Sequence, residues 1–190
     1  MSDEQSSRLA RSTTITKTYF TIKGYKFADD IFKAYLDNNG PDFVYQISPS
    51  NVERMIATAG AREQVAKCVD TIKEQARLDP RTGVTQDITT AWMGAPQEEG
   101  DIGLAVGHYD VGLGSDTTLY MEDGRLRAEI IYRIYIYEYY NFDLLDQKSY
   151  DLNIKDGVNN DMRILEEVGW ARSFRVHGEA PRLERWVGDL

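Results

Sequence analysis

Cysteine and histidine are both scarce in this chain, and their scarcity excludes several kinds of site. Cys68 is the only cysteine, so no disulfide can form within the chain, and its place on a helical apolar stripe predicts a buried thiol. His108 and His177 are the only histidines, and both are expected to be exposed on strands. The sequence has no zinc-type Cys/His spacing, no His-Glu-x-x-His helix and no phosphate-binding or dinucleotide-binding glycine loop. Thiol–imidazole and serine–imidazole catalysis therefore rest on very few residue pairs.

Positive charge and long apolar runs are also in short supply. The 31 acidic and 22 basic residues leave a net charge of −9, which argues against nucleic acid or an anionic membrane as a partner. No apolar stretch reaches the roughly 18 residues that a transmembrane segment needs. Residues 1–14 contain no apolar region of a Sec-type signal peptide. We therefore expect synthesis in the cytoplasm without a Sec signal, and any export by a route that needs no cleavable signal.

The distribution of apolar residues predicts an α+β protein with three parts. Residues 1–14 are polar and lack periodicity, so we expect a loose tail, and Thr14–Tyr25 alternates weakly in the manner of a strand. Residues 15–100 are expected to be mainly helical, ending in an irregular linker from Asp79 to Gly100. Residues 101–190 are expected to form a small, mostly antiparallel, curved sheet or half-barrel that carries one short helix.

Helical spacing places the expected helices. One covers Phe27–Leu36, and a second begins at Asn51, because Ser50 to Glu53 has the form of a capping box. A further apolar stripe from Val65 to Ala76 belongs either to a separate helix or to a kinked continuation. A short helix is expected over Asp161–Val168, followed by Gly169 as a left-handed cap and by a strand over Trp170–His177.

Two strands, Ile102–Leu113 and Asp116–Met121, are expected before the main hairpin, with a turn at Gly112-Leu113-Gly114. Asp123-Gly124 is a strong two-residue hairpin signal. The central strand follows, from Ala128 to Asp143. Its even positions form an apolar face, whereas its odd positions form an amphipathic face that is wet or lightly covered.

The polar end of the central strand is where we expect chemistry. Glu138 lies on the apolar face, and burial raises the pKa of a carboxyl group, which suits a general acid or base. The alternative is a hydrogen-bonded carboxylate at the rim of the sheet with no catalytic role. Tyr140, Asn141 and Asp143 add further oxygen-bearing groups, a set that suits either a hydrated divalent ion or the anchoring of a loop.

The region from Ile102 to Glu179 resembles the activity domain of colicin M and related lipid II-degrading bacteriocins. The resemblance rests on a glycine-containing hairpin, a long aromatic strand ending in Glu138-Tyr139-Tyr140-Asn141-Phe142-Asp143, a loop, a short helix and the segment Phe174–Glu179. Similar strands occur in other antibacterial effector domains. The resemblance implies a colicin M-like fold for the C-terminal part of the chain.

The resemblance also implies an activity. It is that of a toxin which hydrolyses a lipid-linked pyrophosphate of the peptidoglycan precursor with magnesium, acts in the periplasm of a target cell, and is neutralised by an immunity protein. Glu138 and Tyr140 match the first acid and the tyrosine of the family motif. Asn141 stands where the family has its second acid, and Gln147 and Lys148 stand where it has His-Arg.

Two functional hypotheses follow from these substitutions. In the first, an altered hydrolase uses Asp143 or Asp146 in place of the missing acid, Glu138 and Asp143 as magnesium ligands, and Lys148 as a phosphate contact. In the second, the protein is a non-enzymatic binding or structural module in which Glu138 is structural. Its partner, a protein or a glycan, would then contact the aromatic side chains on the odd face of the strand, Tyr135, Tyr137 and Tyr139.

Overall fold

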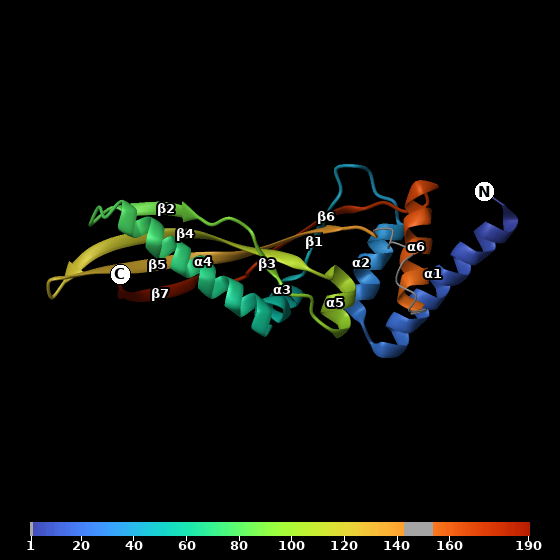
Figure 1. The fold of residues 1–190 in the computed structure, drawn as a ribbon, viewed down its shortest axis with the longest axis horizontal. Coiled ribbons are helices and arrows are strands. Elements are labelled where there is room, and N and C mark those ends of the chain that lie inside the picture. The colour runs from blue at the N-terminus through green and yellow to red at the C-terminus, as the bar shows by residue number, and fades with distance from the viewer. Residues whose placement is uncertain (1, 143–153) are drawn as a thin grey trace. The chain divides into compact units, whose positions relative to one another are not determined.

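The computed structural model describes residues 2–142 and 154–190, and for residues 154–158 it describes only the backbone. In chain order the elements are α1 (Asp3–Lys23), α2 (Lys26–Leu36), β1 (Val44–Gln46), α3 (Pro49–Ile56), α4 (Ala59–Leu78), β2 (Thr85–Thr89), β3 (Met93–Ala95), α5 (Gly100–Val106), β4 (Tyr109–Glu122), β5 (Arg125–Tyr140), α6 (Ile154–Glu167), β6 (Phe174–Glu179) and β7 (Glu184–Asp189) (Figure 1). The strands form an open, mostly antiparallel sheet in the order β1-β6-β5-β4-β2, with β3 added to β4 and β7 to β5. The α+β prediction is confirmed. None of the helices in the described ranges is long and apolar enough to cross a membrane.

The chain divides into two compact units, each assembled from three segments that are distant in the sequence. Unit 1 comprises Met1–Tyr45, Glu99–Gly107 and Tyr139–Val176, and unit 2 comprises Gln46–Glu98, His108–Glu138 and His177–Leu190. Unit 1 therefore contains α1, α2, α5 and α6, whereas unit 2 contains α3, α4 and most of the sheet. The boundary expected near residue 100 does not coincide with this division, because α6 packs on α1 and therefore groups with the N-terminal helices.

The N-terminal region forms one helix, α1, in place of the loose tail and strand expected over residues 1–25. Ser2 caps it by accepting a hydrogen bond from the backbone N–H of Gln5, and Gly24 ends it in a left-handed conformation. Several threonine hydroxyls within the helix donate to carbonyl oxygens four residues earlier. Because only Leu9 and Phe20 are buried, the helix has little of the apolar periodicity by which such an element is recognised.

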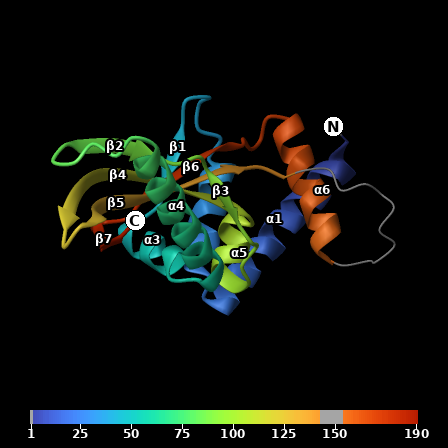
Figure 2. The ribbon, with the colours of Figure 1, turned by 60° about the vertical axis from the view of Figure 1, so that its left-hand side comes forward.

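The helices α3 and α4 are separate elements, and their starts show why. The hydroxyl of Ser48 accepts a hydrogen bond from the N–H of Asn51 and Pro49 occupies the first turn, so α3 begins two residues before the position that the expected capping box predicts. Thr58 caps α4 in the same way through the N–H of Ala61. The helix α4 packs on β2, β3 and β4, and Figures 1 and 2 show it running across these strands. Cys68 is fully buried there, as predicted.

The strands expected before the main hairpin differ from those observed. Residues Gly100–Val106 form the helix α5, which packs on α2, and the Asp101 carboxylate accepts a hydrogen bond from the N–H of Ala28 at 2.9 Å. Gly107, with a φ of 62°, separates this helix from β4. The strand β4 then runs without interruption to Glu122, so the turn predicted at Gly112-Leu113-Gly114 is wrong. Two strands, β2 and β3, lie within the expected linker and pair with β4.

The hairpin and the inner face of the central strand are confirmed. Asp123 and Gly124 both have positive φ angles, 50° and 76°, as a tight two-residue turn requires. The strand β5 begins slightly earlier than expected, at Arg125, and ends at Tyr140. Its buried side chains are all at even positions, namely Ala128, Ile130, Ile134, Ile136 and Tyr140.

The helix and the strand expected near the end of the chain are present, but their first and last residues differ from those expected. The helix α6 starts at Ile154, earlier than the Asp161 expected, and Gly169 has the predicted left-handed conformation with a φ of 76°. The strand β6 covers Phe174–Glu179 in place of Trp170–His177. The strand β7, which was not predicted, pairs with β5 along Arg127–Tyr132.

Candidate binding groove

The predicted site residues at the end of β5 fall into different environments. Glu138 is half-buried and engaged in an interaction, and it is the last residue of its segment in unit 2. Asn141 is exposed and also has a partner. Asp143, Asp146 and Lys148 lie outside the described residues. Among the residues that are described, no group of three or more His, Cys, Asp or Glu side chains could hold a metal ion.

Tyr140 belongs to an aromatic cluster in the core of unit 1. Its ring stacks on Phe174, with centroids 5.3 Å apart, and meets Phe142 and Tyr35 edge-on at 5.4 and 5.7 Å. Burial, and secondarily the nearby Tyr35, raises the pKa of the Tyr140 hydroxyl far above its ordinary value. Because this hydroxyl keeps its proton so strongly, we expect Tyr140 to contribute to packing.

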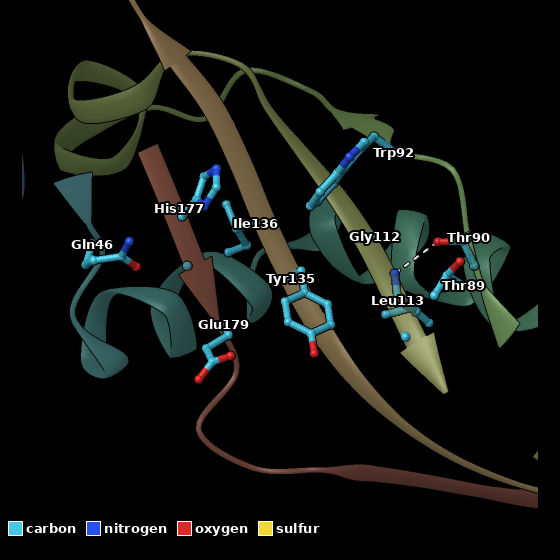
Figure 3. Close-up of a pocket in the computed structure, with 12 residues that line it drawn as sticks. Gln46, Thr89, Thr90, Trp92, Gly112, Leu113, Tyr135, Ile136, His177 and Glu179 are labelled. Atoms are coloured by element: carbon cyan, nitrogen blue, oxygen red, sulfur yellow. Dashed lines mark hydrogen bonds between the residues drawn. The ribbon is translucent and has the colours of Figure 1, made fainter. Parts of the chain in front are cut away.

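Unit 2 contains a groove of about 450 Å³ on the face of the sheet that carries the odd positions of β5 (Figure 3). It is lined by residues of β1, β2, β4, β5 and β6, and by Thr90 and Trp92, which lie between β2 and β3. Those with exposed aromatic or polar groups are Gln46, Thr89, Trp92, Tyr135, His177 and Glu179. A volume of this size is within the ordinary range of small-ligand sites.

Two glycines of β4 make the floor of the groove. Gly112 lies opposite Tyr135 in the register of β4 and β5, and Gly114 lies opposite Arg133. A Cβ atom at Gly112 would come within 3.0 Å of the Trp92 ring, and one at Gly114 within 3.4 Å of the Tyr135 ring. The missing side chains therefore let both rings approach the backbone of β4. Figure 3 shows the Tyr135 ring face-on and the Trp92 ring edge-on, so one ring lies along the floor and the other stands as a wall.

An aromatic row crosses the strands beside this floor. Trp92 and Tyr137 have ring centroids 5.7 Å apart, and Tyr137 and His177 have centroids 5.4 Å apart. Trp92 is 52% exposed and Tyr135 is 37% exposed, although both are large aromatic side chains. The groove thus keeps aromatic surface in contact with solvent. His177 is exposed on a strand, as predicted.

The segment that carries Trp92 is held against β4 by Thr90. The backbone N–H of Thr90 donates to the carbonyl of Leu113, and the Thr90 hydroxyl accepts from the N–H of Leu113, both at 2.9 Å. The same hydroxyl donates to the buried Cys68 sulfur at 3.5 Å. These bonds fix the backbone two residues before Trp92, so the indole is positioned before any ligand arrives. Positioning of this kind lowers the entropic cost of binding.

Polar groups line the far wall of the groove. The Arg133 guanidinium lies 3.4 Å from the Glu179 carboxylate, which extends from β6. β6 is held in turn by a hydrogen bond from the N–H of Ile47 to the carbonyl of His177 at 2.8 Å. Leu113 and Ile136 contribute little to the groove surface, because both are almost completely buried and their positions on β4 and β5 face the core. The groove therefore combines aromatic rings with hydroxyl, amide and charged groups.

Only part of this groove could be predicted from the sequence. The odd face of β5 was expected as a partner surface, and Tyr135 and Tyr137 do lie at the groove, whereas Tyr139 is exposed in a segment of unit 1. Trp92 lies in the stretch Asp79–Gly100, which was expected to be an irregular linker. The signal that was missed is the pair Gly112 and Gly114, two residues apart in a strand and hence on one face, which indicates a close approach by other groups.

Comparison with protein-family models, with curated proteins and with solved structures gives no match to this chain. The likeness to colicin M therefore stays a prediction from the sequence.

Proposed function

We propose that this protein is a binding module and that the groove of unit 2 holds a glycan. The observation that carries the proposal is the pair of solvent-exposed rings, Trp92 and Tyr135, held against a glycine floor by their own strand neighbours. The sequence predicted a binding module whose partner is either a protein or a glycan, and we propose the glycan. The hydrolase and toxin hypothesis remains a separate prediction.

The chemistry of the groove favours a sugar over an apolar peptide segment. One side of a pyranose ring presents C–H groups that pack against an aromatic face, and its edge presents hydroxyls that need hydrogen-bond partners. Tyr135 supplies the face, and Glu179, Gln46 and Thr89 supply acceptors and donors around it. An amphipathic helix or an apolar peptide would need aliphatic pockets for its anchoring side chains. The groove exposes few aliphatic groups, because its leucine and isoleucine are buried.

The proposal is tested by measuring binding of β-1,4-linked glucan and glucosamine oligosaccharides to the full chain by calorimetry. We expect Trp92→Ala and Tyr135→Ala each to weaken binding about tenfold or more, which is the usual effect of removing a stacking aromatic ring. Two exposed aromatic residues of unit 1 provide matched controls, since Trp170 is 48% and Tyr19 is 45% exposed. Trp170→Ala and Tyr19→Ala should leave the affinity unchanged.

Two results would contradict the proposal. One is an absence of binding to every oligosaccharide at millimolar concentration by the folded wild-type protein. The other is an equal loss of affinity in the Trp92 variant and in its Trp170 control, since that would show that exposed tryptophan in general, and not the groove, carries the binding.

A further inference from the structure

The groove is bordered by aspartates that project from the same face of the sheet as its glycine floor. Along β4 the positions on this face are, in order, Asp110, Gly112, Gly114 and Asp116, because alternate residues of a strand share a face. A Cβ atom at Gly94 of β3 would lie 3.6 Å from the Asp110 carboxylate, which places that carboxylate over the same face. The floor therefore has a carboxylate at each end.

A third aspartate extends this arrangement. Asp87 of β2 lies directly opposite Asp116 in the register of β2 and β4, and both side chains are exposed. Like charges placed opposite one another on neighbouring strands destabilise a sheet. Among the described residues, Asp87, Asp110 and Asp116 have no ion-pair partner and no side-chain hydrogen bond.

The arginines of unit 2 on this face are already paired. Arg133 faces Glu179 at 3.4 Å, Arg185 faces Glu129 at 2.6 Å, and Arg127 faces Asp189 at 3.1 Å. These pairs leave the carboxylates of the three aspartates as the unpaired acidic groups on this face of β2 and β4, where they produce a negative field beside the groove. Such a field attracts cationic groups and repels carboxylates, phosphates and sulfates.

We infer that the glycan held in the groove carries unacetylated amino groups, so that its ammonium groups lie beside Asp110 and Asp116 while its rings pack on Trp92 and Tyr135. This inference rests on the proposed function and adds the chemical class of the sugar. An ammonium group beside an aromatic face also gains a cation–π attraction. A basic peptide has the same charge but lacks the pyranose faces, so it is the competing occupant that the experiment must separate.

The experiment uses β-1,4-linked hexasaccharides that differ only at the C2 substituent: glucosamine, N-acetylglucosamine and glucose. Calorimetry with the full chain is run at about pH 6, where the glucosamine amines carry charge, and in about 50 mM and about 500 mM NaCl. We expect the glucosamine hexamer to bind about tenfold more tightly than the glucose hexamer in low salt, and this preference to shrink in high salt. Hexalysine serves as the charged probe without sugar rings.

The aspartates are tested by Asp110→Asn and Asp116→Asn, alone and together. We expect these variants to lose the preference for the glucosamine hexamer and to keep their affinity for the glucose hexamer. Asp123→Asn is the matched control, because Asp123 is exposed in the β4–β5 turn, away from the groove lining, and asparagine tolerates its positive φ. This control should keep the wild-type preference.

The outcomes separate the inference from the proposed function. If the three hexamers bind equally and Trp92→Ala abolishes all binding, the amino-sugar inference is overturned and the glycan groove stands. If no hexamer binds, both fail. Hexalysine could instead bind as tightly as the glucosamine hexamer, with Trp92→Ala changing neither affinity. The aspartates would then attract cations whether or not they carry sugar rings, and the inference would be overturned in favour of a basic peptide.

Discussion

At the scale of single residues, Tyr140 shows how an aromatic environment changes what a phenol can do. Its ring is stacked and flanked by three other aromatic rings, and its hydroxyl lies in the core of unit 1. Ionising such a hydroxyl would bury a negative charge, which is why its pKa is raised. The contribution of Tyr140 to the protein is therefore expected to appear as stability.

This leads to a prediction for alkaline solution. Tyrosine in an unfolded chain ionises near pH 10, whereas Tyr140 in the folded protein keeps its proton well above that value. Above pH 10 the unfolded state binds fewer protons than the folded state, so the free energy of unfolding falls as the pH rises. Below about pH 10 both states are protonated and the group has no effect. Tyr140→Phe should remove up to about 1.4 kcal/mol per pH unit from this fall.

Urea unfolding between about pH 8 and pH 11 measures this slope. Tyr139→Phe is the matched control for the loss of a phenol hydroxyl, because the neighbouring side chain is 47% exposed. Identical slopes in the wild-type protein and the Tyr140 variant would contradict the prediction. Tyr35 also has a raised pKa, mainly through burial, so part of the alkaline loss should persist in the variant.

At the scale of elements, the approach of β6 to α3 determines where one wall of the groove stands. A Cβ atom at Gly178 would lie 2.7 Å from a Val52 methyl group and 3.2 Å from Ile47, and Val52 is fully buried. β6 can come this close only because residue 178 has no side chain. The residues on either side of Gly178, His177 and Glu179, thereby reach the groove.

The second prediction concerns this contact. Gly178→Ala should lower the free energy of unfolding by about 1–3 kcal/mol, because the added methyl group overpacks a buried contact. Gly94→Ala in β3 is the control, since a Cβ atom there meets only the Asp110 carboxylate at an ordinary 3.6 Å. That substitution should be neutral or slightly stabilising, as alanine restricts the unfolded chain more than glycine does.

Urea denaturation of the two alanine variants at neutral pH gives both values. Equal stability of the Gly178 and Gly94 variants would show that α3 and β6 accommodate the added methyl group without loss of stability. This result would contradict the inference that β6 needs glycine at position 178 to approach α3.

At the scale of the whole molecule, each unit is built from segments that are far apart in the sequence. The strand β5 contributes residues to both, with the division falling between Glu138 and Tyr139. Glu138 does not line the groove, although it belongs to the same unit. The binding proposal and the hydrolase prediction therefore rest on different residues and can be tested in one variant.

We expect Glu138→Gln to bind the glucosamine hexamer with wild-type affinity. The same protein is then tested for release of phosphorylated product from a lipid-linked peptidoglycan precursor in the presence of magnesium. Release by the wild-type protein that is lost in Glu138→Gln would confirm the hydrolase prediction. If the wild-type protein releases nothing, and its expression in the periplasm harms no cells, the hydrolase prediction is wrong and the binding proposal is unaffected. A loss of hexamer binding in Glu138→Gln would contradict the separation of the two sites.

Local features of this fold could be predicted because each depends on residues that are neighbours in the chain. The inner face of β5 follows from alternation, the turn at Asp123-Gly124 from the conformational freedom of its residues, and the helix Lys26–Leu36 from its apolar spacing. Buried Cys68 follows from the same spacing in α4. The helix α1 was missed because few of its side chains are buried, and α5 because its seven residues do not complete an apolar stripe.

The groove was decided by tertiary structure. Trp92, Gly112, Tyr135 and His177 come from four separate stretches of the sequence, and only strand pairing and register bring them together. The amino-acid sequence by itself determined that β5 would have one apolar face and one tyrosine-rich face, because side-chain direction in a strand alternates with every residue. Which tyrosines meet a tryptophan, a glycine floor and unpaired aspartates was decided by the neighbours of β5, since contacts between strands depend on register and not on distance along the chain.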